Sequence, residues 1–248
     1  VLECSRAWLF AHADETVSDE LGGRFDALLE RRARGEPVAY LVGRREFWSL
    51  PFEVTPVVLI PRPETELLVE TALKHIPREN PARVADLGTG SGAVAIALAV
   101  ERPLCEIHAT DVSDAALEIA RRNAERLAPG RVTFHEGDWL EPLEGLFDAI
   151  VSNPPYIDRD DDHLERGDCR FEPPVALTPG EKGMAAIERI ANDAGACLGA
   201  GGCLAFEHGF EQGGASRQVL EREGFVRVET RKDLAGRERV TLGFRPGS

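Results

Sequence analysis

The chain of 248 residues is long enough to bury a substantial core, and its 43 Asp and Glu against 29 Lys and Arg give a formal net charge of −14. This acidic balance repels a phosphate backbone and disfavours direct binding of nucleic acid. The sequence has no stretch of the roughly 20 apolar residues that span a bilayer, and no basic segment followed by an apolar run opens it. We therefore expect a cytoplasmic protein with no membrane partner.

The five cysteines are scattered, odd in number, and never paired as C-x-x-C. This usage suggests neither a disulfide framework nor a zinc site, so we expect reduced cysteines and no metal.

The first forty or so residues predict helices. Four apolar side chains recur at i, i+4, i+7 and i+8 and form one stripe. They are Leu21, Phe25, Leu28 and Leu29. Ser18 precedes the stripe as an N-cap, and Gly35 followed by Pro37 is a stop signal. Because the chain begins at Val1 rather than Met, we expect a natural N-terminal segment to be missing.

A short hairpin is predicted next. Residues 45–56 alternate apolar and polar side chains around a Ser-Leu-Pro turn. Residues 59–76 then run into a helix, with Pro63 near its first turn and Glu64 and Glu66 at its positive end. The hairpin therefore joins the helical part to the rest of the chain.

From residue 83 the pattern changes to strand, turn and helix in alternation, which favours a mostly parallel sheet covered on both faces. The expected strands are 83–87, 106–111, 131–137, 147–153, 201–209, 225–233 and 239–244, and the expected helices are 92–100, 113–127, 183–198 and 211–224. The last two strands are joined by Leu-Ala-Gly-Arg-Glu, which is too short for a helical crossover. That pair should therefore be antiparallel.

The segment DLGTGSGA, residues 86–93, follows the first of these strands and opens a helix. Its three glycines let the backbone turn tightly and let a ligand approach the main chain. The spacing also satisfies the dinucleotide pattern G-x-G-x-x-G/A, and a tight turn without a ligand is a further alternative.

Asp111 ends the next strand, where a carboxylate can accept both hydroxyl protons of a ribose. It could instead cap the following helix, although Ser113 serves that purpose better. After the third strand, Asp138 could bind an adenine amino group and Trp139 could cover the ring, although an isolated Trp more often belongs to a core. With Asn153, these residues follow consecutive parallel strands, at the edge where open α/β sheets bind ligands.

Residues 153–156, Asn-Pro-Pro-Tyr, leave the fourth strand as a stiff bend. Asn153 offers a side-chain carbonyl, while Pro154 and Pro155 fix φ, lack an N–H and leave backbone carbonyls as acceptors. Such acceptors suit a planar nitrogen that carries two hydrogens, an amide or an exocyclic amine. Tyr156 would pack on the substrate plane or near a cationic methyl donor. Two prolines alone would predict only a turn, as at residues 171–177.

The segments 86–92 and 153–156 resemble those of class I S-adenosylmethionine-dependent methyltransferases that act on planar nitrogens. That group includes DNA adenine-N6, ribosomal RNA guanine-N2 and protein glutamine methyltransferases. Residues 35–66, 151–157 and 171–177 further resemble the HemK/PrmC family, the release factor glutamine methyltransferases. This resemblance covers nearly the whole chain, and the first of the three segments is highly specific.

The resemblance implies an α/β, Rossmann-like methyltransferase fold: a mostly parallel seven-stranded sheet with an antiparallel last strand, a small N-terminal helical domain and a hairpin linker. The implied division is a helical substrate-recognition domain at 1–45, the β-hairpin linker at 46–60 and the catalytic domain at 61–248. Because the helical part is short for the family, we expect it to be truncated.

The implied activity is N5-methylation of the glutamine amide in the Gly-Gly-Gln loop of class I peptide chain release factors by a monomer. S-adenosylmethionine is the implied cofactor, S-adenosylhomocysteine the product, and no metal takes part. The implied cofactor-binding residues are Gly88, Thr89, Gly90, Ser91, Gly92, Asp111, Asp138, Trp139 and Asn153. The substrate-binding residues are Asn153, Pro154, Pro155 and Tyr156, of which Asn153, Pro154 and Tyr156 are the catalytic set.

Other functions stay open from the sequence. A nucleic-acid amine methyltransferase would use the same chemistry on a flipped base, and a ribosomal-protein glutamine methyltransferase would use it on another protein. An NAD-dependent oxidoreductase would use the glycines and Asp111 but leaves residues 153–156 unexplained, and a binding module needs no turnover. Arg62 is expected to neutralise a carboxylate or to wall the pocket. His208 is expected to be a structural residue or pocket wall.

Overall fold

The computed structural model describes residues 2, 4–180 and 183–247, and its centre is a seven-stranded sheet. The strand order is β5-β4-β3-β6-β7-β9-β8, with β9 antiparallel to both neighbours and the other pairs parallel. The strands are β3 (Arg83–Leu87), β4 (Glu106–Asp111), β5 (Val132–Glu136), β6 (Phe147–Ser152), β7 (Leu198–Glu207), β8 (Val226–Lys232) and β9 (Glu238–Phe244). The predicted fold class, with its antiparallel last pair, is confirmed.

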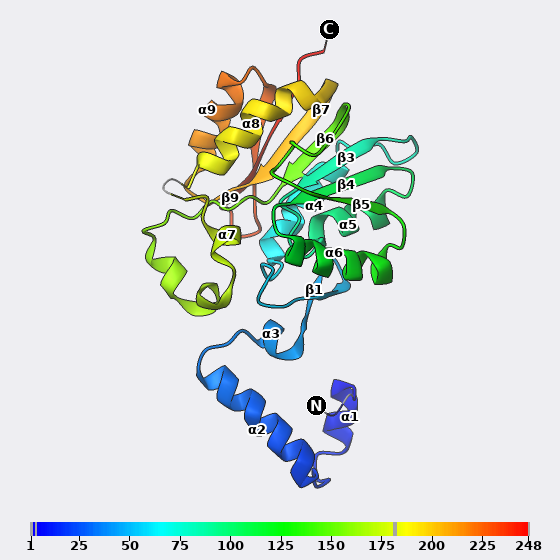
Figure 1. The fold of residues 1–248 in the computed structure, drawn as a ribbon, viewed down its shortest axis with the longest axis vertical. Coiled ribbons are helices and arrows are strands. Elements are labelled where there is room, and N and C mark those ends of the chain that lie inside the picture. The colour runs from blue at the N-terminus through cyan, green and yellow to red at the C-terminus, as the bar shows by residue number, and fades with distance from the viewer. Residues whose placement is uncertain (1, 3, 181–182, 248) are drawn as a thin grey trace.

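Helices cover both faces of this sheet (Figure 1). One face carries α4 (Glu66–Leu73), α5 (Ala93–Glu101) and α6 (Asp114–Leu127), and the other carries α8 (Ala185–Cys197) and α9 (Gly213–Arg222). The predicted N-cap Ser113 is confirmed, since its hydroxyl accepts from the Ala116 N–H at 3.2 Å. Helix α4 follows a 3₁₀ turn, η1 (Pro63–Thr65), which begins with the proline expected there.

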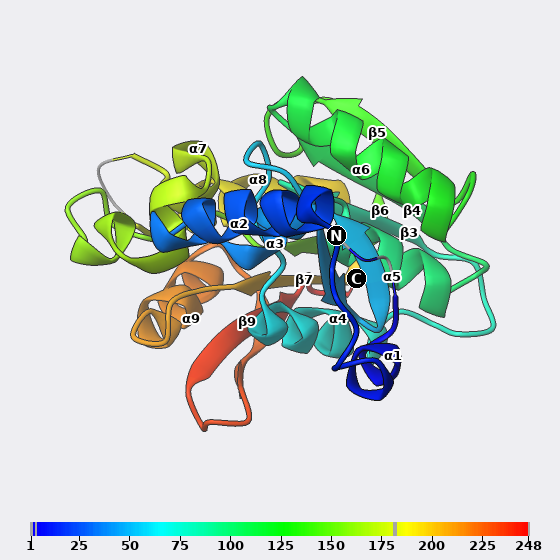
Figure 2. The ribbon, with the colours of Figure 1, turned by 90° about the horizontal axis from the view of Figure 1, so that it is seen from below.

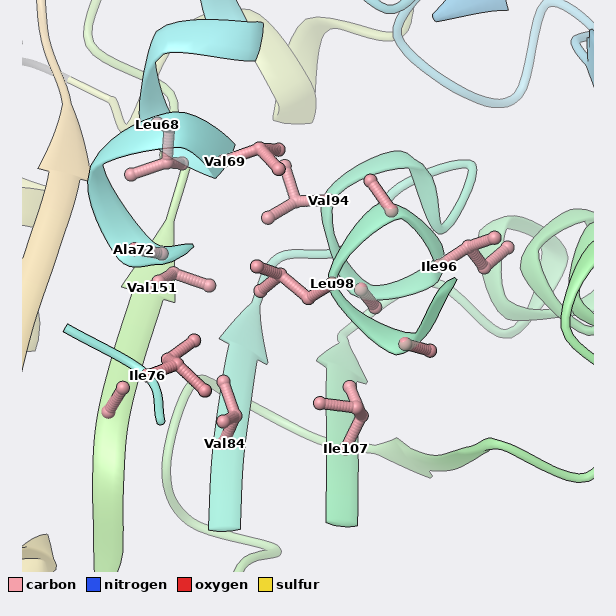
Figure 3. Packing of buried hydrophobic residues seen from close by; sticks show 14 of the residues in the cluster. Leu68, Val69, Ala72, Ile76, Val84, Val94, Ile96, Leu98, Ile107 and Val151 are labelled. Atoms are coloured by element: carbon pink, nitrogen blue, oxygen red, sulfur yellow. The ribbon is translucent and has the colours of Figure 1, made fainter. Parts of the chain in front are cut away.

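The core lies on both faces of the central strands. Val84 and Ala85 are neighbours in β3, both fully buried, and they point into different hydrophobic clusters. Figure 3 shows the first cluster, in which Leu68 of α4 and Leu98 of α5 pack over Val84 and Val151. Burial on both faces accounts for the consecutive apolar residues Ala149–Ile150–Val151 of β6.

The N-terminal helices are α1 (Arg6–Ala11), α2 (Asp19–Ala33) and α3 (Val38–Val42). Ser18 caps α2 as predicted, accepting from the Leu21 N–H at 3.4 Å. No residue of α2 is buried among the described residues, and Phe25 and Leu29 of the predicted stripe are about half exposed. Figures 1 and 2 show α1 and α2 beyond one end of the sheet, joined to it through α3.

The hairpin forms where expected, but its turn lies earlier. Strands β1 (Arg44–Phe47) and β2 (Leu50–Glu53) are antiparallel, with Phe47 opposite Leu50. The turn is therefore Trp48 and Ser49, both at positive φ (52° and 55°), and the predicted Ser-Leu-Pro turn is wrong. A two-residue turn of this hand matches the strand twist. Strand β1 also begins within the segment that was predicted to be helical.

The long connection from β6 to α8 carries η2 (Asp162–Glu165), η3 (Gly167–Phe171) and α7 (Pro174–Leu177). Among the helices of the described ranges, none has the length and apolar character of a membrane span. The division at residues 45 and 60 stays a prediction.

The substitution Gly92→Ala tests how closely α5 and α6 pack. Its φ is 83°, and an added Cβ would lie 2.9 Å from Ile96 Cδ1 and 3.3 Å from the Ala120 Cβ. We expect Gly92→Ala to lower the free energy of unfolding by about 2–4 kcal/mol, through left-handed strain and overpacking. Gly23→Ala is the control, because it lies in α2 with no atom within 4 Å of the added Cβ. It should be neutral or stabilising by up to about 1 kcal/mol in urea unfolding. Equal effects of the two variants would contradict the packing.

Candidate active site

A cavity of about 470 Å³ opens at the carboxyl ends of β3, β4, β5 and β6. Its size is that of a small-molecule site. Six of the residues predicted to bind a cofactor line it: Gly88, Gly90, Asp111, Asp138, Trp139 and Asn153. The strand order reverses between β3 and β6, which is where open parallel sheets bind ligands. We call this the first cavity.

The glycine-rich loop divides into residues that line the cavity and residues that shape the loop. Gly88 lies under the Trp139 ring, where an added Cβ would be 3.1 Å from Cζ3. Thr89, Ser91 and Gly92 do not line the first cavity. The Thr89 hydroxyl donates to Asp86 at 2.6 Å, and the Ser91 carbonyl accepts from the Asn123 side chain at 2.9 Å. These contacts hold the loop in shape.

Asp86 is buried beneath the loop and was not among the predicted site residues. One carboxylate oxygen, Oδ2, accepts from the Thr89 hydroxyl and from the Ala95 N–H at 3.1 Å. Burial raises the pKa of Asp86 to about 6, although both hydrogen bonds oppose the rise. Its position just before the glycines was the only signal of this role in the sequence.

Asp111 is held rigidly at the end of β4. Its Oδ1 accepts from the Ser113 N–H and its Oδ2 from the Gly90 N–H, both at 2.9 Å. Burial raises the pKa of this carboxyl, against the pull of these N–H groups. Each carboxylate oxygen keeps a further lone pair, so the group can also accept ligand hydroxyls. Ser113 caps α6, so Asp111 does not fill that position.

Asp138 shares its carboxylate with a neighbour that sequence reasoning missed. Arg189 of α8 lines the cavity, and its Nη1 donates to Asp138 Oδ2 at 2.5 Å while its Nη2 donates to Glu141 at 2.8 Å. Trp139 adopts a positive φ of 49° and packs partly against the core beneath α8. The Trp is therefore both a cavity wall and a core residue.

Two loops supply a mostly apolar part of the remaining wall. These residues are Val57, Val58 and Leu59 before η1, and Pro173, Val175 and Ala176 at α7. Val57 and Val175 stay about half exposed at the mouth. Both loops belong to segments that carry the family resemblance, 35–66 and 171–177, but nothing local in them marks a cavity wall.

Asn153 also lines a second, smaller cavity of about 120 Å³ together with Arg62, Tyr156 and Leu177. The Asn153 Nδ2 donates to the Thr65 hydroxyl at 3.2 Å. In the described part of the chain no group donates to Asn153 Oδ1 or to the Pro154 carbonyl. Among the described residues, Asn153 Oδ1 is therefore an unpaired acceptor on a residue that lines both cavities, whereas Pro154 is buried and lines neither of them.

Tyr156 is fixed at both ends. Its hydroxyl donates to Glu207 Oε1 at 3.0 Å, and its carbonyl accepts from the Gln212 side chain at 2.9 Å. Burial, and then the neighbouring Glu207, raise the pKa of Tyr156 well above its usual value. The ring lines the second cavity and not the first, while Pro155 lines the first.

Arg62 and His208, whose roles the sequence left open, both have hydrogen-bond or ion-pair partners in the structure. Arg62 lines the second cavity and forms an ion pair with the buried Glu172, whose Oε1 accepts from the Ile60 N–H at 3.0 Å. His208 is fully buried and lines neither cavity. Its ring nitrogens bond Gly209 O and Thr241 Oγ1, both at 2.8 Å, so both are occupied by the protein itself. Within the described ranges, no group of three or more His, Cys, Asp or Glu side chains could hold a metal.

This sheet order, with the ligand cavity at the reversal point and an antiparallel β9, defines a class I methyltransferase fold. The chain is similar to a crystal structure of a methyltransferase from Pyrococcus furiosus, with a TM-score of 0.61 and 21% identity over 89% of this chain and 98% of that one. Residues 63–167 match the family described as the methyltransferase small domain.

Sequence similarity narrows this class. Residues 1–43 match the family described as the PrmC N-terminal domain. The chain is 53% identical over 247 residues to the release factor glutamine methyltransferase of Xylella fastidiosa strain 9a5c, covering 99% of this chain and 90% of that one. It is 50% identical over 239 residues to that of Escherichia coli K12, covering 96% and 86%. The chain therefore belongs to the release factor glutamine methyltransferase family.

Asp86→Asn tests the buried carboxyl. The variant keeps an oxygen for both hydrogen bonds but never carries a charge. From about pH 4 to 6 folded Asp86 stays largely protonated while the unfolded chain has lost the proton, so wild-type stability falls as pH rises. Relative to Asp86→Asn, we expect the free energy of unfolding to fall by up to about 3 kcal/mol between pH 4 and 7. Asp26→Asn, at an exposed position, is the control. A flat difference between wild type and Asp86→Asn would refute this origin.

Proposed function

We propose that this protein transfers a methyl group from S-adenosylmethionine to the side-chain amide nitrogen of the glutamine in the Gly-Gly-Gln loop of class I peptide chain release factors. Family membership supports the activity. The observation that carries the chemistry is the position of Asn153, which borders both cavities and keeps its carbonyl oxygen unpaired within the described residues.

The first cavity fits the cofactor. The main chain at Gly88 and Gly90 can be approached closely, and Asp111 offers two oriented oxygens to the ribose hydroxyls. Trp139 and the valines of the wall suit an apolar ring face. Asp138 can accept from an adenine amino group only alongside Arg189, which already donates to it. When bound, S-adenosylmethionine supplies an electrophilic methyl group on a cationic sulfur.

The second cavity suits the glutamine side chain. Its volume of about 120 Å³ is that of roughly four waters, enough for a short side chain. Leu177 and the Tyr156 ring offer apolar contact to its methylene groups, and its amide would lie against Asn153, which lines both cavities. We assign Pro155, which lines the first cavity, to separating the two.

The catalytic problem is the weak nucleophilicity of an amide nitrogen, whose lone pair is delocalised into the carbonyl. Asn153 Oδ1 and the Pro154 carbonyl would accept the two N–H groups, which aligns the nitrogen and stabilises the positive charge that develops on it. The alkylated nitrogen loses its proton readily, so no strong base is needed beforehand. This agrees with His208, whose ring nitrogens both bond within the protein itself.

A protein substrate is favoured over nucleic acid by the net charge of −14 and by the family. The direct test mixes the protein with methyl-labelled S-adenosylmethionine and a class I release factor. We expect label on the factor, and none on the same factor with its loop Gln changed to Ala. Equal labelling of both factors, or label only on RNA, DNA or ribosomal proteins, would overturn the assignment.

Asn153→Ala tests the acceptor. We expect methyl transfer to fall at least 100-fold, because the loss of one preorganised hydrogen-bonding group typically costs that much. Cofactor affinity measured by calorimetry should change little. Asn80→Ala, at an exposed site just before β3, is the matched control and should keep full activity. Near-normal turnover by Asn153→Ala would refute the mechanism.

A further inference from the structure

Resting on the proposed function, we infer that Thr65 and Glu207 are positioning residues for the reaction. Together they hold the Asn153 amide so that its oxygen, and not its NH₂ group, is presented to the substrate amide. Neither residue lines the first or the second cavity, so each acts through another side chain.

Glu207 is a buried acid with no direct part in the proposed methyl transfer. It ends β7, and the preceding residue, Phe206, pairs with Ser152 just before Asn153. Its side chain is 1% exposed, its Oε1 accepts from the Tyr156 hydroxyl, and Oε2 has no hydrogen-bond partner within the described residues. Burial raises the pKa of Glu207, while the hydroxyls of Thr65 and Tyr156 oppose the rise. Burying a carboxyl costs free energy, so its presence here points to a role for Glu207.

Thr65 connects this acid to Asn153. Its side chain is buried, and its hydroxyl accepts from Asn153 Nδ2. Because Ser152 pairs with Phe206, Glu207 leaves β7 next to Asn153. The Thr65 hydroxyl works against the rise in the pKa of the Glu207 carboxyl. A hydroxyl has one proton and two lone pairs. Since the hydroxyl accepts on the Asn153 side, its proton is free to turn toward the Glu207 carboxyl.

The polarity of this arrangement fixes the Asn153 amide. The oxygen and NH₂ ends of an amide exchange by a half-turn, with almost no change in shape. If the Asn153 NH₂ group faced the substrate, it would meet the substrate NH₂ group, and two donors cannot form a hydrogen bond. An ionised carboxylate can only accept, so it turns the Thr65 proton toward itself and leaves a lone pair for the Asn153 NH₂ group. The oxygen of Asn153 is then the end available to the substrate.

The Tyr156 hydroxyl is the second group held by the same carboxyl. One buried acid therefore acts on both ends of the segment from Asn153 to Tyr156. Two residues that line the second cavity therefore depend on the Glu207 carboxyl. We expect its loss to have a larger effect than the loss of a single hydrogen bond.

The test compares Thr65→Val, which keeps the shape but loses the hydroxyl, with Thr65→Ser, which keeps the hydroxyl. At about pH 8 we expect Thr65→Val and Glu207→Gln each to lower kcat for release factor methylation about 10-fold or more. Thr65→Ser should stay within about threefold. The KM for S-adenosylmethionine and the affinity for S-adenosylhomocysteine should stay within about twofold in all three variants. The double variant Thr65→Val/Glu207→Gln should lose little more than Glu207→Gln alone, because Thr65 acts through the same carboxyl, which also holds Tyr156.

A second readout needs no substrate. The side-chain NH₂ resonances of Asn153, identified by their loss in Asn153→Ala, report its bond to Thr65. We expect their exchange with solvent to be about 10-fold faster in Thr65→Val and Glu207→Gln than in wild type or Thr65→Ser. This comparison stands even if the wild type does not methylate a release factor, which would refute the proposed function alone.

The inference is overturned if Thr65→Val matches Thr65→Ser in kcat and in amide exchange, or if the two single losses multiply in the double variant. Should Glu207→Gln fail to fold, the two Thr65 variants decide the matter alone, and a normal melting temperature of each serves as the control.

Discussion

The pairing of β3 with β6 is the constraint on which the site depends. Leu87 stands opposite Ser152, and the Ser152 hydroxyl donates to the Leu87 carbonyl at 2.8 Å. The next residues along each strand are Gly88 and Asn153, so the glycine-rich loop and the Asn-Pro-Pro-Tyr bend leave the sheet side by side. A parallel ladder ends all of its strands at one edge, and the reversal of strand order opens a space there for a ligand. The cofactor and substrate residues meet because of this register.

Buried acids hold the loops around that space. Asp86 anchors the glycine-rich loop through Thr89, Glu172 joins Ile60 and Arg62 to the loop before α7, and Glu207 anchors Tyr156. Burial raises the pKa of each of these carboxyls. Each accepts a hydrogen bond or ion pair from a neighbouring loop, and Glu172 and Glu207 do so from segments distant in sequence, which gives loops without regular structure a fixed shape. The cost of burying a carboxyl is thus offset by rigidity at the place where alignment matters.

The periodicity of the sequence predicted the strands and helices of the sheet closely, because two buried faces leave continuous apolar runs and helices leave 3.6-residue stripes. It placed the hairpin turn wrongly, since Leu50 and Pro51 look like turn residues but pair within β2. It also predicted an apolar stripe on α2, and no residue of that helix is buried within the described chain. Tyr156 was expected at the substrate plane or methyl donor, and the structure puts its ring beside the second cavity and its hydroxyl on Glu207. A local sequence pattern does not show which distant residue will form a hydrogen bond with a given side chain.

The sequence by itself determined the order of elements, the glycine-rich loop, the stiff bend after β6 and the family, because each has a cause within a few neighbouring residues: backbone freedom, proline geometry or apolar period. Only the tertiary structure decided which residues support the site. Thr65 lies 88 positions from Asn153, and Glu207 lies 51 from Tyr156. Arg189 reaches Asp138 from 51 positions away. A hydrogen bond depends on distance and direction in space, and those are fixed only when the strands have paired and the helices have packed over them.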